Sequence, residues 1–245
     1  MKRYGLIGYP LSHSFSKKFF TDKFEKEGLK DCVYENFPLE KIEQLGVLIK
    51  SDPSLLGFNV TIPYKEQVLH FLAGANQLVK SSGACNCIKI ADGKLYGFNT
   101  DIIAFEQSLQ HKLKPHHSNA LILGTGGAAK AVQFVLQKLG IRYQYVSRKK
   151  SMGNLSYDEL TDKVIASHLL IVNTTPLGMF PQVVEAPPIP YKAIGPQHFL
   201  FDLIYNPEKT LFLQKGEERG AAIQNGYEML VLQAEESWRI WNEGK

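Results

Sequence analysis

The stretch that most constrains the fold is "LILGTGGAAKA", residues 121 to 131. Gly124, Gly126 and Ala129 form a G-x-G-x-x-A pattern directly after an apolar strand and at the start of a predicted helix. Such small residues allow a tight turn, close approach of the backbone to a pyrophosphate, and close packing of helix on strand. Glycines are common in turns, but in this strand-to-helix context the pattern predicts a dinucleotide-binding βαβ unit.

Strand and helix patterns alternate after residue 120, as they do in doubly wound parallel sheets. Apolar stretches of strand length are separated by helical stretches throughout this region. The predicted strands lie near residues 120 to 123, 142 to 147, 168 to 172, 199 to 204 and 220 to 224. This region is therefore predicted to form a Rossmann-type domain with a doubly wound parallel sheet.

The region before residue 110 also alternates and predicts a separate α/β domain. Its predicted strands are 4 to 9, 32 to 37 and 56 to 62, and Asp92-Gly93 is typical of a hairpin turn. Apolar residues recur at helical spacing between these strands. The predicted helices are one with Phe15, Phe19, Phe20 and Phe24, one near 40 to 50, one opened by Pro63, and one with Ile102, Phe105 and Leu109.

A polar stretch, "HKLKPHHSN" at residues 111 to 119, interrupts the pattern and predicts a domain boundary. We expect one domain over 1 to 110 and a nucleotide-binding domain over 111 to 225, with a cleft between them. The last helix, 226 to 245, is expected to pack back on the first domain. Its predicted apolar stripe holds Tyr227, Leu230, Ala234, Trp238 and Trp241, flanked by Met229, Gln233 and Ser237.

The strand at 57 to 62 places polar side chains opposite an apolar face. Phe58, Val60 and Ile62 share the apolar face, and Asn59 and Thr61 share the other. Polar residues in this position usually point to water, but strand-to-helix turns of α/β proteins are also where sites form. Either a surface or a pocket is consistent with this pattern.

The second strand of the βαβ unit ends in basic residues where NAD-binding proteins carry an acid. "YQYVSRKK" offers Ser147, Arg148, Lys149 and Lys150. A carboxylate would repel a 2′-phosphate, whereas a guanidinium binds one with paired, charge-assisted hydrogen bonds. The pattern favours NADP over NAD, and its alternative is a solvated basic turn.

Composition narrows the class of protein. The formal charge of +4 over 245 residues is too small and scattered for a nucleic-acid binder. The three cysteines, Cys32, Cys85 and Cys87, are too few for a disulfide framework and lack partners at zinc spacing, so we expect packed thiols and no metal. No stretch is typical of a membrane span, and we expect a cytoplasmic protein with no membrane partner.

Several residues of the first domain suit a site, although each has an ordinary alternative. Ser14 and Ser16 begin a helix and could hold a carboxylate, but serines also cap helices. Asp101 begins a helix too, where a cap or first-turn charge is common. Lys65 by itself is typical of a solvated side chain.

Eight ordered segments across nearly the whole chain closely resemble the shikimate dehydrogenase family. They are "SHSFS", "GFNVTIPYKE", "GACN", "GFNTD", "GTGGAAKA", "NTTPLGM", "DLIYNP" and "NGYEMLVLQA". The resemblance implies NADP-dependent reduction of 3-dehydroshikimate to shikimate in the pathway to aromatic amino acids. It implies a substrate-binding, catalytic first domain, a second domain that binds NADP, and a monomer or homodimer acting on a small molecule.

The resemblance also implies roles for individual residues. Lys65 and Asp101 would be the catalytic pair, and Ser14 and Ser16 would bind the substrate carboxylate. The remaining substrate contacts would be Thr61, Asn86, Tyr205 and Gln233. The cofactor contacts would be Gly124, Gly126, Gly127, Ala128, Ser147, Arg148, Lys149, Leu203 and Gly226.

The sequence departs from the family pattern at a few positions, and other functions remain open. Lys17 stands where relatives commonly carry proline, and Ser147 and Lys149 flank Arg148 where the family usually has Asn-Arg-Thr. One alternative is a quinate/shikimate dehydrogenase with relaxed substrate or cofactor choice. Another is a non-enzymatic NADP-binding regulatory protein, which would tolerate loss of the lysine and carboxylate that this chain retains.

Overall fold

The computed structural model describes residues 1–11, 15–150 and 153–243. The chain forms two compact units, Met1–Thr100 with Ala234–Lys245, and Asp101–Gln233. The chain thus passes into the second unit at the start of helix α4 (Thr100–Gln110). The polar stretch at residues 111 to 119, where the sequence predicts the boundary, follows the end of that helix. It returns to the first unit within helix α8 (Tyr227–Asn242).

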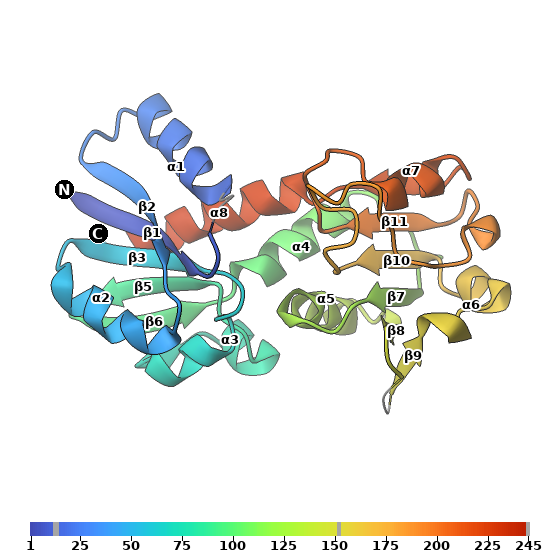
Figure 1. The fold of residues 1–245 in the computed structure, drawn as a ribbon, viewed down its shortest axis with the longest axis horizontal. Helices are drawn as coiled ribbons and strands as arrows, with labels where there is room; N and C mark the ends of the chain where they lie inside the picture. Colours follow the sequence, from blue (N-terminus) through green and yellow to red (C-terminus); the bar gives the residue numbers. More distant parts are fainter. Residues whose placement is uncertain (12–14, 151–152, 244–245) are drawn as a thin grey trace. The chain divides into compact units, whose positions relative to one another are not determined.

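The first unit is built on a mixed six-stranded sheet (Figure 1). Its strand order is β2-β1-β3-β5-β6-β4. β1 pairs in parallel with β2 and β3, whereas β5 runs antiparallel to β3 and β6. The strands are β1 Lys2–Gly8, β2 Cys32–Pro38, β3 Leu55–Val60, β4 Gly74–Ala75, β5 Cys87–Ala91 and β6 Lys94–Phe98.

The predicted hairpin at Asp92-Gly93 is confirmed. Asp92 and Gly93 have φ angles of 50° and 68°, and Ala91 pairs with Lys94 across the turn. Two consecutive positive φ values give the backbone twist that suits a two-residue hairpin, which is why the Asp-Gly pair predicts it.

Helices cover both faces of this sheet (Figure 1). α1 (Phe15–Lys26) contributes Phe20 and Phe24 to one core, and α2 (Leu45–Ser51) contributes Leu45 to the other. The other helical segments of the unit are η1 Ile42–Gln44, η2 Gln67–Phe71 and α3 Gln77–Ser82. A sheet covered on both faces buries its polar residues too, and Asn59 is only 4% exposed.

The predicted helix opened by Pro63 is wrong, and β3 is shorter than predicted. The strand ends at Val60, and Ile62, a member of the predicted apolar face, is 74% exposed. The Tyr64 N–H donates to the Thr61 carbonyl at 2.9 Å, and its hydroxyl donates to the Leu39 carbonyl at 2.5 Å. This buried anchor holds the chain in a turn, so helical structure begins only at η2.

The stripe predicted for α8 is wrong at its start. Tyr227 is 53% exposed, whereas the flanking positions Met229, Gln233 and Ser237 are buried. The end of the helix packs inside the first unit. The Trp241 ring stacks on Tyr4 at 4.9 Å, and its indole N–H donates to the Ile88 carbonyl at 2.9 Å.

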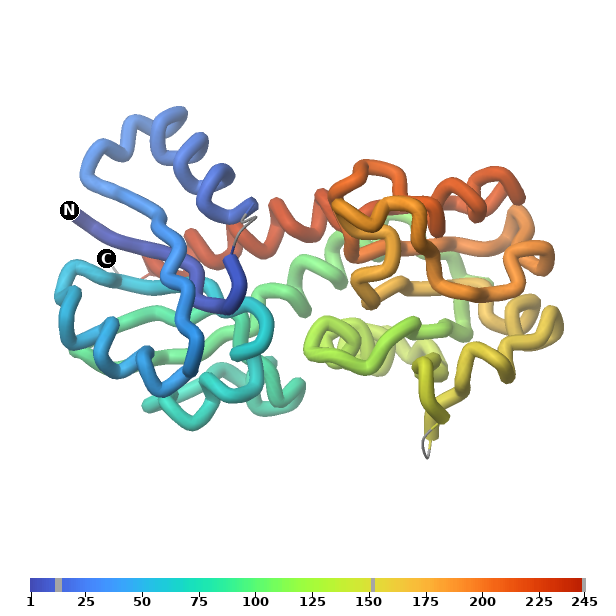
Figure 2. The backbone as a smooth tube through the Cα atoms, viewed as in Figure 1, coloured from blue at the N-terminus to red at the C-terminus, as the bar shows by residue number. Residues whose placement is uncertain are grey.

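The second unit is built on an all-parallel six-stranded sheet, whose chain Figure 2 traces from green through yellow to red. Its strand order is β12-β11-β10-β7-β8-β9. The three strands that come first in the chain, β7 to β9, form one half of the sheet, and β10 to β12 form the other, as in Rossmann folds. The strands are β7 Asn119–Leu123, β8 Arg142–Ser147, β9 Asn154–Ser156, β10 Leu170–Asn173, β11 Phe199–Asp202 and β12 Ala222–Gln224.

The helices of the second unit connect these strands. They are α5 Gly127–Lys138, η3 Tyr157–Glu159, α6 Asp162–Ser167, η4 Tyr191–Ala193 and α7 Leu211–Glu217. The unit also contains α4 from Asp101 onward and α8 as far as Gln233. β9 was not predicted, because three residues are too few to show a strand pattern. The predicted fold class, an α/β domain joined to a Rossmann-type domain, is confirmed.

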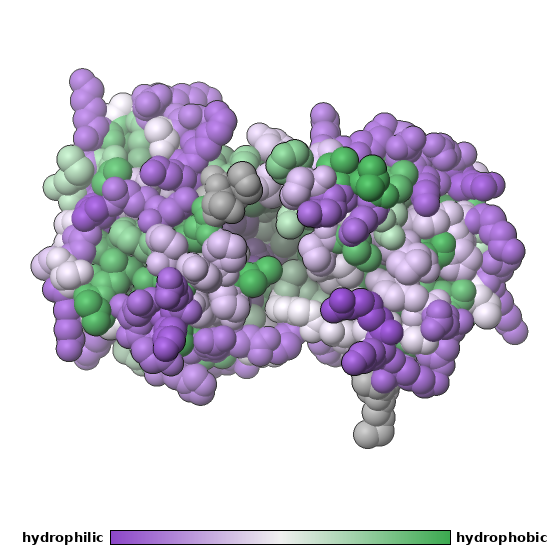
Figure 3. All heavy atoms as spheres, viewed as in Figure 1, coloured by the Kyte–Doolittle hydropathy of each residue, from purple (hydrophilic) through white to green (hydrophobic). Residues whose placement is uncertain are grey.

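The face of the molecule drawn in Figure 3 is mostly hydrophilic, with hydrophobic residues scattered over it. Within the described ranges, no helix combines the length and the hydropathy needed to cross a bilayer.

Candidate functional site

The glycine loop after β7 requires its first glycine for steric reasons. Gly124 has a φ of +110°, which side chains rarely adopt, and a Cβ there would lie 2.6 Å from the Thr174 Oγ1. The Gly124 N–H donates to the Val146 carbonyl at 2.8 Å, so the loop is tied to the end of β8. The turn between β7 and α5 is therefore fixed by the fold itself.

The second glycine, Gly126, has a different environment. It is the N-cap of α5 in extended conformation, and a Cβ there would meet no heavy atom within 4 Å among the described residues. The protein's own packing does not need a glycine at this position. The open space lies at the N-terminus of a 12-residue helix that begins with Gly127 and Ala128. The backbone N–H groups and the helix dipole there suit an anionic group such as a pyrophosphate.

The basic turn after β8 contains one cation held in an ion pair and two exposed cations that are not. Lys150 forms an ion pair with Glu159, which holds the pKa of that carboxyl below its usual range. Arg148 and Lys149 are exposed, and neither takes part in an ion pair with the residues the structure describes. The Ser147 hydroxyl donates to the Lys149 carbonyl at 2.5 Å and so shapes the turn. Two cations thus remain available for a ligand.

Tyr157 lies close enough to Arg148 to interact with it electrostatically. Burial raises the pKa of the Tyr157 phenol to about 12, and the positive charge of Arg148 opposes that rise. No sequence pattern had singled out Tyr157.

The loop after β11 holds Leu203 against Gly226. A Cβ on Gly226 would lie 2.1 Å from the Leu203 carbonyl oxygen, so a side chain cannot fit there. The Gly226 N–H donates to the Ile204 carbonyl at 3.0 Å. Both segments are therefore fixed in close contact.

Asp202 anchors the start of the same loop. Its carboxyl accepts hydrogen bonds from the Ile204 N–H at 3.0 Å and the Thr210 hydroxyl at 2.6 Å. Burial nevertheless raises the pKa of Asp202 to about 7. Tyr205 follows in this loop, and burial raises the pKa of its phenol.

In the first unit, backbone hydrogen bonds bring three predicted site residues together. The Thr61 N–H donates to the Ile7 carbonyl at 2.9 Å, at the end of β3. The carbonyl of Lys65 accepts the Cys85 N–H at 2.8 Å, which ties the Lys65 turn to the residue before Asn86. The Val60 N–H donates to the Asn86 carbonyl at 2.8 Å, so the backbone at Thr61 and at Lys65 lies next to the segment that carries Asn86.

Asn86 is bound through its side chain to the start of α4. Its Oδ1 accepts the Thr100 N–H at 2.7 Å, and its Nδ2 donates to the Thr100 Oγ1 at 2.9 Å. Asp101 is the next residue, in the first turn of α4. Sequence reasoning missed Thr100, although a threonine before an acid at a helix start is a recognisable capping signal.

The other predicted substrate residues are placed as follows. Ser16 is buried in the first turn of α1, and Ser14 lies outside the described residues. Gln233 is 9% exposed on α8, and its Nε2 donates to the Leu230 carbonyl at 3.0 Å. Asp101, Tyr205 and Gln233 belong to the second unit with the predicted cofactor residues.

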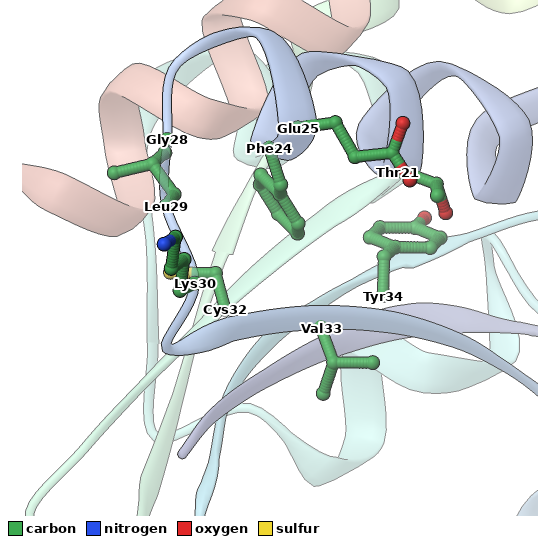
Figure 4. A pocket seen from close by; sticks show the side chains of 9 residues that line it. All are labelled: Thr21, Phe24, Glu25, Gly28, Leu29, Lys30, Cys32, Val33 and Tyr34. Carbon is green, nitrogen blue, oxygen red and sulfur yellow. The ribbon is translucent and has the colours of Figure 1, made fainter.

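Two cavities lie away from all of these residues. One of about 400 Å³ lies between α1 and β2 in the first unit, where Phe24, Leu29, Cys32 and Tyr34 line it (Figure 4). The other, of about 570 Å³, lies in the second unit beside His111, Gln224 and Glu228. Neither contains a predicted site residue. Cys85 and Cys87 are fully buried, as expected of packing thiols.

Comparison with known proteins matches both units. The family model described as "Shikimate dehydrogenase substrate binding domain" matches residues 6–88. A shikimate dehydrogenase (NADP(+)) of Clostridium beijerinckii is 40% identical over 256 residues, which cover 99% of this chain and 93% of the relative. A relative of the same name from Caldicellulosiruptor saccharolyticus is 35% identical over 259 residues, with 98% and 92% covered.

A solved structure agrees with these matches over the full length. The shikimate 5-dehydrogenase of Thermus thermophilus, in complex with NADP(H) and shikimate, superposes with a TM-score of 0.87 at 28% identity. The match covers 99% of this chain and 94% of that one. The identity to relatives, the coverage and the two sheet topologies lead to one conclusion: the chain belongs to the shikimate dehydrogenase family.

Proposed function

We propose that this protein is an NADP-dependent shikimate dehydrogenase, which reversibly reduces 3-dehydroshikimate to shikimate. The observation that carries this proposal is that a chain 40% identical to a shikimate dehydrogenase (NADP(+)) holds the backbone of Lys65 next to Asn86 through the hydrogen bond from the Cys85 N–H to the Lys65 carbonyl. The same chain carries a glycine loop with open space at a helix N-terminus. A binding module would need the second feature but not the first.

Polar groups of the first unit, together with Tyr205 and Gln233 of the second, suit the substrate. Ser14 and Ser16 bind the carboxylate, and Thr61, Asn86 and Gln233 bind ring hydroxyls, with Tyr205 as a further contact. Asn86 is well suited to this role. Its amide offers two donors and two acceptor lone pairs, and among the described residues Thr100 uses one of each. One N–H and one lone pair therefore remain for a hydroxyl.

Lys65 and Asp101 form the catalytic pair. Bound NADPH supplies the hydride that adds to the C3 carbonyl carbon of the substrate. Negative charge then develops on the carbonyl oxygen, and the Lys65 ammonium stabilises this charge and donates a proton to the oxygen. Asp101 orients the ammonium and accepts a substrate hydroxyl.

The cofactor residues divide into three groups. Gly124, Gly126, Gly127 and Ala128 would hold the pyrophosphate at the start of α5 through backbone N–H groups. Ser147, Arg148 and Lys149 bind the 2′-phosphate, while Lys150 is already paired with Glu159. Leu203 and Gly226 complete the site from their fixed contact. The open space at Gly126 suits a pyrophosphate, and Arg148 and Lys149, which form no ion pair among the described residues, suit the negative charge of the 2′-phosphate.

The direct test is an assay of the purified wild-type chain. We expect shikimate-dependent reduction of NADP, followed by absorbance of NADPH, with quinate and NAD as the comparison substrate and cofactor. Turnover of quinate at a comparable kcat/KM would support the relaxed-specificity alternative. Failure to turn over shikimate while NADP still binds would favour a regulatory NADP-binding protein.

Replacement of Arg148 tests the phosphate site. Arg148→Ala should raise KM for NADP by ~10-fold or more, the effect of losing one or two charge-assisted hydrogen bonds, and should leave KM for NAD nearly unchanged. Raising the ionic strength should weaken NADP binding more than NAD binding, because screening acts on the exposed extra phosphate. Steady-state kinetics with both cofactors measure these effects.

Lys150→Ala is the matched control in the same turn. Because Lys150 is held by Glu159, its loss should change KM for NADP by less than ~3-fold. Equal losses for NADP and NAD in the Arg148 variant would contradict the phosphate-binding role and leave this segment a solvated turn.

Two further predictions concern the cellular compartment and the oligomeric state. The buried thiols Cys85 and Cys87 are consistent with a cytoplasmic protein. Oligomeric state, monomer or homodimer, can be measured by light scattering.

A further inference from the structure

A continuous network of buried polar side chains runs through the core of the first unit. Its centre is Asn59, whose Oδ1 accepts the Tyr34 hydroxyl at 2.9 Å. The Asn59 Nδ2 donates to the Ser237 Oγ at 2.8 Å and to the Asn86 carbonyl at 3.3 Å. Asn59 is 4% exposed, Tyr34 1% and Ser237 fully buried. Water therefore cannot replace any of these bonds without a change in packing.

One end of the network reaches the proposed ring-hydroxyl contact. Ser237 lies 3.4 Å from the Thr100 Oγ1, and Thr100 holds both polar atoms of the Asn86 side chain. Asn86 is thus bound at its carbonyl by Asn59 and at its side chain by Thr100. Its orientation is fixed from two sides.

The other end of the network reaches the proposed carboxylate contact. Burial raises the pKa of the Tyr34 phenol well above its usual value, and a side-chain hydrogen bond with Ser16 opposes that rise. Figure 4 shows the Tyr34 ring rising from β2 toward α1. The ring stacks on Phe20 of α1 at a centroid distance of 4.5 Å. Tyr34 therefore links α1, which carries Ser16, to Asn59.

We propose that Tyr34, Asn59 and Ser237 are positioning residues, which hold Ser16 and Asn86 in the fixed relation that one shikimate molecule requires. The inference rests on the proposed function, since it concerns the orientation of the proposed substrate contacts. In a core lined by Tyr4, Phe20 and Trp241, a polar network is costly unless every member is satisfied. A purely apolar core would pack the same elements without this cost, so orientation of the contacts explains the polar residues.

Tyr34→Phe is the sharpest test, because it removes one hydroxyl and keeps the ring that packs on Phe20. We expect KM for shikimate to rise about 5-fold or more, the effect of about one lost buried hydrogen bond, with KM for NADP unchanged. Ser237→Ala removes the acceptor for Asn59 from the other side and should show the same selective rise. Kinetics with each substrate varied in turn measure both values.

Tyr191→Phe is the matched control for loss of stability. It also removes a tyrosine hydroxyl that donates one hydrogen bond, here to the Pro187 carbonyl at 2.8 Å, in the second unit. We expect a similar fall in melting temperature and an unchanged KM for shikimate. A network that served stability alone would lower the melting temperatures of Tyr34→Phe and Ser237→Ala while leaving their KM for shikimate at the wild-type value, and that result would overturn the proposal.

The wild-type assay in the same series separates the two proposals. If the wild type turns over shikimate and KM is unchanged in Tyr34→Phe and Ser237→Ala, the positioning role is rejected and the proposed function stands. Absence of both shikimate turnover and shikimate binding by calorimetry in the wild type rejects the proposed function, and the positioning role with it.

Discussion

Replacement of Lys65 by alanine should lower kcat for shikimate oxidation by at least ~100-fold, as expected for loss of a positioned proton-transfer group. KM for shikimate should rise far less, because the carboxylate and hydroxyl contacts of Ser16, Thr61 and Asn86 remain. The expected signature is therefore a loss in kcat and kcat/KM together. Steady-state kinetics with saturating NADP measure it.

Lys50→Ala is the control for general effects of removing a lysine from the first unit. Lys50 lies in the last turn of α2, is exposed, and has no proposed role. Both variants should melt near the wild-type temperature. Near-native kcat in the Lys65 variant would contradict its assignment and make Asp101 the remaining candidate for proton transfer.

Replacement of Gly226 by alanine should destabilise the second unit strongly. The added Cβ would lie 2.1 Å from the Leu203 carbonyl oxygen, a backbone atom that cannot move aside as a flexible side chain would. The hydrogen bond from Gly226 to Ile204 holds the two segments together at this point. We expect the free energy of unfolding to fall by ~3 kcal/mol or more, as for severe overpacking. Urea unfolding followed by circular dichroism measures it.

Gly46→Ala is a control for which we expect the free energy of unfolding to rise instead of fall. Gly46 lies in α2, and a Cβ there would meet nothing within 4 Å among the described residues. Alanine should therefore stabilise this helix by ~0.5–1 kcal/mol, because glycine loses more backbone entropy on folding. An unchanged unfolding free energy in the Gly226 variant would mean that the contact with Leu203 relaxes at little cost, and would contradict a fixed geometry there.

The second unit could be predicted well because its signals are local. Fully buried parallel strands are continuous apolar runs, and the glycine loop marks one strand-to-helix turn. The three-residue strand β9 carries too short a pattern to detect. In the first unit, Pro63 suggested a helix start, but the bond from Tyr64 to Leu39 fixes a turn there. That contact joins residues 25 apart in sequence, and local propensity carries no information about it.

The sequence could predict which residues belong to the candidate site, but not which of them contact one another. Motifs named Lys65, Asn86 and Arg148, but the bond between Asn59 and Ser237 spans 178 residues of sequence. Alternation in β3 placed Asn59 opposite the apolar face, where either water or a pocket was expected. The second covering layer of helices makes that face a core instead, so Asn59 became a buried hydrogen-bond centre.

The position of Trp241 has a consequence for the order in which the protein is made. The first unit begins at the N-terminus, yet its core contains Ala234, Ile240 and Trp241 from the last turns of α8. Gly57 leaves the space that the Trp241 ring fills, since a Cβ there would lie 2.4 Å from its Nε1. On the ribosome, residues 101 to 233 are all synthesised before this aromatic side chain is added. The first unit therefore begins synthesis first but completes its packing last, after every residue of the second unit has been made.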